Sequence, residues 1–162
     1  MRLTFDSHSP AQTRRLGTLL AAHFRPGDVV LLQGELGAGK TCLAQGIGAG
    51  LRVKEAVKSS SFVLVNEYSG RLRVYHADLF RLEDPQEVFE LGLEENAADG
   101  LLLVEWPDRA PEEMPPEHLL VRFEIVDDRR RRITLEPRGE RYEAIVREVA
   151  AAEEKTGDRK RR

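Results

Sequence analysis

The fold is indicated most directly by one run of residues, Val29-Val30-Leu31-Leu32-Gln33-Gly34-Glu35-Leu36-Gly37-Ala38-Gly39-Lys40-Thr41. It begins with an unbroken apolar run, which is typical of a strand buried on both faces of a sheet. The part from Gly34 onward has three glycines in eight residues and matches the pattern G-x-x-x-x-G-K-[ST]. The residues from Thr41 to Leu51 favour a helix. A strand, a glycine loop and a helix in this order predict a phosphate-binding loop, or P-loop.

The chemistry of phosphate binding explains the residue types in this loop. Several backbone N–H groups must point inward at close range, which glycines permit, and the following helix directs the positive end of its dipole at the anion. Lys40 is expected to reach the β- and γ-phosphates of a nucleotide, and the hydroxyl of Thr41 to bind Mg²⁺. The predicted nucleotide-binding residues are Gly34, Glu35, Leu36, Gly37, Ala38, Gly39, Lys40, Thr41 and Cys42.

Two acidic residues are candidates for metal binding and catalysis. The run Leu101-Leu102-Leu103-Val104 predicts a second buried strand, which carries Glu105 to the carboxyl edge of the sheet, where ligands of α/β proteins bind. Asp78 follows another predicted strand. The predicted catalytic residues are Lys40, Glu105 and Asp78, and the predicted Mg²⁺ ligands are Thr41, Glu105 and Asp78. The alternatives are a merely exposed strand-end carboxylate at Glu105 and a cap or turn at Asp78.

Two sequence patterns that are missing limit which nucleotide and which kind of metal ion are expected. No N-K-x-D sequence is present, which favours ATP over GTP. No second His or Cys stands at ligand spacing from His76, so a transition-metal site is not expected. His76 itself is compatible with contact to a phosphate or a partner, or with packing on an inner strand. No sequence feature identifies an arginine finger.

Apolar spacing and turn residues predict the remaining elements. Ser9-Pro10 is typical of a helix start, with Ser9 as N-cap. The others are a strand over 2–6, a hairpin pairing 62–68 with 72–76, a helix opened by Asp84-Pro85, a proline-rich loop over 107–116, a hairpin of 119–126 with 133–135, and a helix over about 140–152. The fold expected is an α/β, P-loop NTPase-like three-layer sandwich with a mixed, largely parallel central sheet and a β-hairpin extension. It forms one domain, 1–153, followed by a disordered charged tail, 154–162.

Composition limits the class of protein. The chain of 162 residues, with 41% apolar and 33% charged residues, is long enough for one globular core. No stretch approaches the roughly 20 apolar residues of a membrane span, and no secretory signal is visible, so a cytoplasmic protein is expected. The single cysteine, Cys42, excludes an internal disulfide. The basic clusters Arg129–Arg132 and Arg159–Arg162 indicate a solvated hairpin tip and tail, or proximity to RNA.

Four segments together resemble one known family. They are GELGAGKT, SSSFVLVNEY, YHADLFRL and LLLVEWPDR, in that order. A P-loop, an H-x-D-L-[YF]-R-L stretch and an E-W pair in so short a chain resemble the TsaE (YjeE) family of small bacterial P-loop ATPases. The resemblance extends from about Leu16 to Phe123.

The resemblance implies a function that spacing alone does not give. Members of the family hydrolyse ATP with Mg²⁺ and are needed for threonylcarbamoyl modification of the adenosine beside the anticodon in tRNA. They do not carry out the transfer, but dock on a TsaD–TsaB pair and let it cycle. The resemblance therefore implies TsaD and TsaB as partners, tRNA reached through the complex, and weak ATPase activity for the protein alone.

The resemblance also assigns residues. Lys40, Thr41, Glu105 and Asp78 match the family's phosphate-binding lysine, Mg²⁺ hydroxyl, strand-end acid and H-x-D acid. Trp106 matches the family tryptophan, as a partner-facing anchor or a cover for the sheet edge. Ser59-Ser60-Ser61-Phe62 stands where S-P-T-[FY] is common, which makes Ser59, Ser61 and Phe62 switch candidates without the stiffening proline. Cys42 stands where a second Thr is common.

Two other functions fit the same P-loop. One is a small-molecule kinase, which needs an acceptor pocket and usually an arginine-bearing lid. The proline-rich, acidic segment 107–116 is a poor lid for phosphates. The other is a nucleotide-gated binding module, in which ATP orders a docking surface and hydrolysis is incidental.

Overall fold

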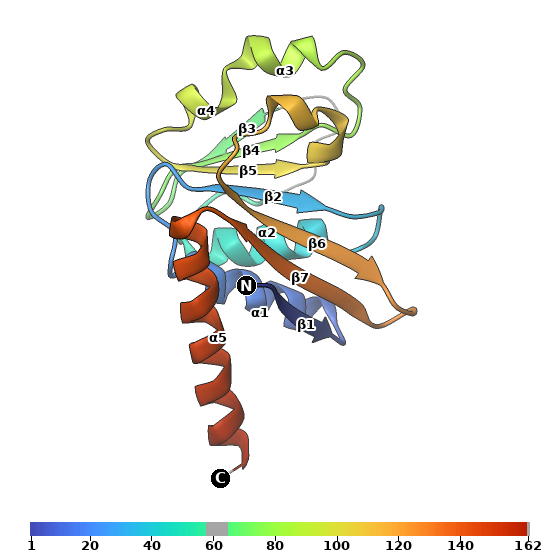
Figure 1. Ribbon diagram of the computed structural model, residues 1–162, viewed down its shortest axis with the longest axis vertical. Coiled ribbons are helices and arrows are strands. Elements are labelled where there is room, and N and C mark those ends of the chain that lie inside the picture. Colours follow the sequence, from blue (N-terminus) through green and yellow to red (C-terminus); the bar gives the residue numbers. More distant parts are fainter. Residues whose placement is uncertain (58–64, 162) are drawn as a thin grey trace.

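A seven-stranded sheet forms the middle layer of the protein, with helices on both faces (Figure 1). This is a computed structural model, and it describes residues 1–57 and 65–161. The elements are β1 Leu3–Ser7, α1 Pro10–Ala21, β2 Val29–Gln33, α2 Lys40–Gly50, β3 Val65–Tyr68, β4 Val74–Asp78, α3 Gln86–Leu91, α4 Leu93–Asn96, β5 Leu101–Glu105, η1 Pro107–Arg109, η2 Pro111–Glu113, β6 His118–Ile125, β7 Arg131–Arg138 and α5 Glu140–Arg161, where η marks a 3₁₀ helix.

The sheet is mixed, with a parallel centre. The strand order is β1-β7-β6-β2-β5-β4-β3. The four central strands, β6, β2, β5 and β4, are parallel to one another, whereas β7, β1 and β3 add antiparallel pairs toward the edges. The predicted α/β fold with a largely parallel central sheet is confirmed. The carboxyl ends of β2, β4 and β5 consequently lie at one edge.

Each face of β2 belongs to a different core. Val30 and Leu32 pack in the cluster beneath α1, α2 and α5, while Val29 and Leu31 pack in the cluster that includes Val88 of α3. Residues that alternate along a strand point to opposite faces, so a strand covered on both faces must be apolar throughout. This burial on both faces explains the unbroken apolar run from Val29 to Leu32.

Glycines let α1 and α2 pack in backbone contact. A Cβ at Gly46 would collide with the backbone of Arg14, and one at Gly50 would lie 2.6 Å from the Cβ of Ala21. The hydroxyl of Thr18 also donates to the carbonyl of Gly46 over 3.1 Å. Gly46 and Gly50 disfavour helix by their intrinsic preference, but they are the residues that allow α1 to approach α2.

The structure differs from the sequence-based prediction in two connecting regions. The single helix expected after Pro85 is two short helices, α3 and α4, because Gly92 between them takes a left-handed conformation with φ 56°. The proline-rich loop contains the 3₁₀ turns η1 and η2, each begun by a proline, which suits the first helical position.

The last helix is longer than predicted. α5 continues from Glu140 to Arg161, where the sequence-based prediction ended it near residue 152 and expected a disordered tail from 154. Alanine, glutamate, lysine and arginine dominate this end and favour helix without needing a core. Figure 1 shows the end of α5 extending beyond the sheet. None of the helices in the described ranges combines the length and apolar character needed to cross a membrane.

We expect Gly46→Ala to lower the free energy of unfolding by about 1–3 kcal/mol, because its methyl group meets fixed backbone of α1. Urea denaturation followed by circular dichroism measures the change. Ala49→Gly, at an exposed position of the same helix, is the control for intrinsic helix preference, about 1 kcal/mol. If Gly46→Ala were more stable than the parent protein, the close approach of α1 and α2 would be contradicted.

Candidate functional site

The P-loop lies between the end of β2 and the start of α2, as the sequence predicts. Gly37 and Gly39 take left-handed conformations, with φ 79° and 108°, that side-chain-bearing residues rarely adopt. At Gly34 the limit is space, because a Cβ would lie 2.8 Å from the Cβ of Phe123 on β6. The three glycines are therefore required by backbone geometry and by a neighbouring strand. The loop ends at the N-terminus of α2, where backbone N–H groups without helical partners and the helix dipole favour an anion.

Lys40 is folded back over this loop. Its side chain is 5% exposed, and its amine donates to the carbonyl of Gly34 and, over 3.2 Å, to that of Glu35. The amine also lies 3.8 Å from the centroid of the Trp106 ring, within cation–π range. Phosphate oxygens would compete with these carbonyls for the same ammonium group.

Burial and neighbouring charge act on Lys40 in opposite directions. Burial lowers the pKa of the amine below its usual value. Three carboxylates, those of Glu105, Asp78 and Asp108, partly oppose that shift in pKa. The amine is thus poorly hydrated and lies near carboxylates. Poor hydration makes the attraction between the ammonium group and a bound anion stronger than it would be at an open surface.

Glu105 is paired with His76 inside the protein. Glu105 is 2% and His76 3% exposed, and Oε2 of Glu105 lies 2.7 Å from Nε2 of His76. The other ring nitrogen, Nδ1, is buried and has no hydrogen-bond partner among residues 1–57 and 65–161. Glu105 is therefore a buried carboxylate held by one histidine, not an exposed acid at a strand end. His76 is the packed histidine that the sequence left as one of its alternatives.

Asp78 lies beside Glu105 at the end of the neighbouring strand. The two residues are register partners in the parallel pair of β4 and β5. Asp78 is partly exposed, and its Oδ1 accepts a hydrogen bond from the backbone N–H of Phe80. Asp78 therefore does cap a turn, as one alternative predicted, and this hydrogen bond holds its carboxylate beside Glu105. The structure brings Asp78, Glu105 and Lys40 together.

Trp106 covers Lys40 at the edge of the sheet. It takes a left-handed backbone conformation, φ 61°, which is uncommon for a bulky residue. Its backbone N–H donates to the carbonyl of Leu32 over 3.2 Å. Its ring centroid lies 4.9 Å from that of Phe80. These contacts support the covering role, and the partner-facing role of Trp106 stays a prediction.

Some residues at the site were not predicted. Phe123 sets the space at Gly34, Phe80 supports Trp106, and Arg131 on β7 donates from Nε to the carbonyl of Gly37 over 3.3 Å. Arg131 belongs to the basic cluster Arg129–Arg132, but sequence spacing gave no reason to place it against the P-loop.

Of the other predicted residues in the loop, Leu36 is exposed and Ala38 is buried. Thr41 and Cys42 form the first turn of α2 and are partly exposed. The switch candidates Ser59, Ser61 and Phe62 lie outside the described residues.

We expect His76→Leu to lower the free energy of unfolding by about 3–5 kcal/mol, because it leaves the buried carboxylate of Glu105 without its partner. Chemical denaturation at neutral pH measures the loss. The double variant His76→Leu, Glu105→Leu removes both groups and should recover much of it. If the double variant were as unstable as the sum of its single variants, the two side chains would not be coupled.

Comparison with known proteins gives a consistent result. The family model described as "Threonylcarbamoyl adenosine biosynthesis protein TsaE" matches residues 7–133. A "tRNA threonylcarbamoyladenosine biosynthesis protein TsaE" of Bacillus subtilis is 38% identical over 151 residues, which are 92% of this chain and 94% of the relative. The protein of the same name from Treponema pallidum is 36% identical over 80% of this chain and 96% of its own.

A solved structure agrees with the sequence matches. The crystal structure of Bacillus subtilis YdiB superimposes with a TM-score of 0.78 at 32% identity, covering 94% of this chain and 97% of that one. The family model spans most of the chain, including the P-loop, Asp78 and Glu105. The chain belongs to the TsaE family.

Proposed function

We propose that this protein binds and hydrolyses ATP as an accessory to the threonylcarbamoyl modification of the adenosine next to the anticodon in tRNA, in the cytoplasm. The names of its relatives support the pathway. The observation that carries the ATPase part is the meeting of Lys40 with Glu105 and Asp78 at one edge of the sheet. A lysine on a glycine loop facing strand-end carboxylates suits phosphoryl transfer to water.

Nucleotide binding requires Lys40 to change partners. The β- and γ-phosphates of ATP take the place of the carbonyls of Gly34 and Glu35 at the ammonium group. Backbone N–H groups of the loop and the N-terminus of α2 bind the same oxygens. Because the site is poorly hydrated, Lys40 stabilises the negative charge that develops on the transferred phosphoryl group.

The oxygen donors at the site fit Mg²⁺. Thr41, Asp78 and Glu105 offer hydroxyl and carboxylate oxygens, the hard ligands that this ion takes. Within residues 1–57 and 65–161, no group of three or more His, Cys, Asp or Glu side chains is arranged to hold a metal alone. That fits an ion completed by phosphate oxygens and water, as in other nucleotide sites. Bound Mg²⁺ supplies positive charge between the phosphates.

The interactions of Glu105 and Lys40 give a physical reason for low activity in the protein alone. His76 engages the carboxylate that would orient water, and backbone carbonyls engage the amine that would bind phosphate. A partner that favours their release raises turnover. We propose the TsaD–TsaB pair as that partner, with tRNA reached through the complex.

The chain contains one tryptophan, so Trp106 reports directly on the site. We expect Mg²⁺–ATP to change its fluorescence intensity, because Lys40 leaves the ring when it binds phosphate. A titration with ATP and with a non-hydrolysable analogue measures the change. Thr41→Ala should weaken the response to Mg²⁺. An unchanged spectrum under conditions where calorimetry detects ATP binding would show that Lys40 stays against Trp106.

The decisive measurement is ATP hydrolysis by the purified protein, alone and with the TsaD–TsaB pair and tRNA. We expect low turnover alone and strong stimulation by the pair. Lys40→Ala should abolish the turnover of the protein alone and the stimulated turnover, since losing one such contact to the reacting group typically slows a reaction about a hundredfold or more. Lys54→Ala, at an exposed lysine, is the matched control.

Two results would change the proposal. Equal turnover with and without the pair would support ATP hydrolysis but would contradict a role in tRNA modification. A Glu105→Ala variant that binds ATP, cannot hydrolyse it and still supports many rounds of modification would favour the nucleotide-gated binding module.

A further inference from the structure

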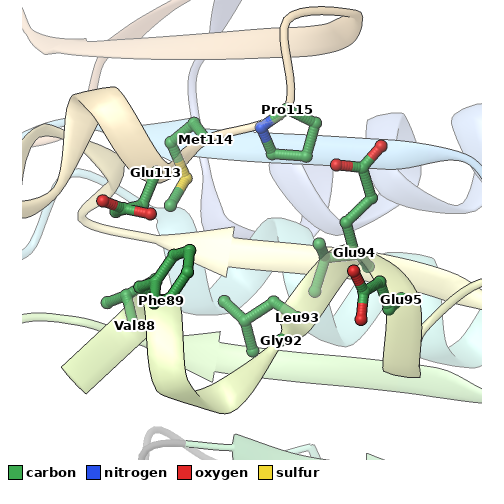
Figure 2. A pocket seen from close by; sticks show the side chains of 10 residues that line it. Val88, Phe89, Gly92, Leu93, Glu94, Glu95, Glu113, Met114 and Pro115 are labelled. Atoms are coloured by element: carbon green, nitrogen blue, oxygen red, sulfur yellow. The ribbon is translucent and has the colours of Figure 1, made fainter. Parts of the chain in front are cut away.

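A small groove with both apolar and acidic lining lies on the face of the protein covered by α3 and α4. It has a volume of about 200 Å³ and lies between the two helices and the segment that follows η2 (Figure 2). Its apolar lining includes Phe89, Leu93 and Met114, and its acidic lining is Glu94, Glu95 and Glu113. None of these residues belongs to the nucleotide site, which lies at the carboxyl ends of β2, β4 and β5.

Phe89 is exposed beside this groove. Val88 on the same helix is 3% exposed, whereas Phe89 is 64% exposed. A second hollow, of about 300 Å³, lies against Leu93 and is lined partly by Leu91 and Tyr75. The helices are short, six and four residues, and leave apolar surface accessible around Leu93. A large exposed aromatic beside a lined hollow is typical of an interaction site.

The surroundings of the groove are strongly acidic. Residues 83–99 contain seven acidic side chains and no Lys or Arg: Glu83, Asp84, Glu87, Glu90, Glu94, Glu95 and Asp99. None of the seven forms an ion pair with a residue of the described ranges. Glu113, which lines the groove from the segment after β5, adds further negative charge. Such a surface repels RNA and anionic membranes and attracts basic groups.

We propose that the groove docks a protein partner through an apolar side chain carried on a Lys- or Arg-rich segment. The apolar side chain fills the groove against Phe89 and Leu93, and the basic groups pair with Glu94, Glu95 and their neighbours. Leu102, near the start of β5, also lines the groove, so an occupant there leaves the P-loop at the opposite end of the strands open. This inference does not depend on ATP hydrolysis or on the proposed pathway.

The test uses the full chain and two fluorescein-labelled synthetic peptides, one of alternating Lys and Leu and one of alternating Glu and Leu. Fluorescence anisotropy measures binding at low and at high salt. We expect the Lys-Leu peptide alone to bind. Phe89→Ser should weaken it about tenfold, the loss expected when an aromatic anchor is removed. Glu94→Gln with Glu95→Gln should weaken binding and flatten its salt dependence.

Matched controls distinguish binding at the groove from nonspecific electrostatic or hydrophobic binding elsewhere on the surface. Ile125→Ser removes another exposed apolar side chain, and Glu124→Gln another exposed carboxylate, both on β6. Both should bind the Lys-Leu peptide as the parent protein does. Thermal unfolding confirms that each variant is folded, and ATP hydrolysis by Phe89→Ser should equal that of the parent protein.

Four results would overturn the proposal. The groove would anchor no apolar side chain if the two peptides bound equally well, or if the Lys-Leu peptide bound Phe89→Ser as tightly as the parent protein. Concentration-dependent dimers in light scattering that disappear in Phe89→Ser would assign the groove to a second copy of this chain. Loss of peptide binding in Ile125→Ser would place the interaction at the β6–β7 hairpin. Failure of the ATPase experiment leaves each of these readouts intact.

Discussion

The site depends on the parallel pairing of β2, β5 and β4. Parallel neighbours end at the same edge of a sheet, so the glycine loop after β2, Glu105 at the end of β5 and Asp78 at the end of β4 meet there. Both faces of these strands are covered by helices, so the strands are buried and their residues are almost all apolar. Without this pairing, Lys40 would face solvent, and the two acids, far apart in sequence from the loop, would have no common place to act.

The cost of the arrangement lies in its buried charges. Lys40, Glu105 and His76 are each 5% exposed or less. Removing charged groups from water is unfavourable unless they are paired, and here the pairing is local: amine with loop carbonyls, carboxylate with imidazole. Trp106 completes the enclosure by lying over the amine. In the proposed function these groups exchange partners, because a phosphate and a metal ion offer them stronger ones. Poor hydration strengthens the interaction of such groups with any charge that is brought to them.

Acidic and basic side chains are separated along the chain. Residues 83–99, which include α3 and α4, are acidic and contain no Lys or Arg, whereas the β6–β7 hairpin carries Arg129–Arg132, from which Arg131 reaches the P-loop at Gly37. A net charge of −3 conceals this separation. Partners of opposite charge can therefore approach different parts of the surface without competing. The 3₁₀ turns η1 and η2 join Trp106 at the nucleotide site to Met114 at the groove within nine residues of chain.

Local patterns in the chain are enough to predict most elements and the residue types at the site. An apolar run, glycines, Lys40 and Thr41 identify β2, the P-loop and α2, because local steric limits and phosphate chemistry leave few alternatives. Which of these residues are in contact depends on the tertiary structure. The pairing of His76 with Glu105 follows from the register of β4 against β5, and sequence spacing does not encode register between distant strands. The role of Gly46 depends on the approach of α1, and the space at Gly34 depends on Phe123 of β6. The length of α5 was underestimated because the absence of core residues was taken to end a helix that local preference continues. Contacts between segments far apart in the chain are set by the packing of the whole sheet, and no local pattern records them.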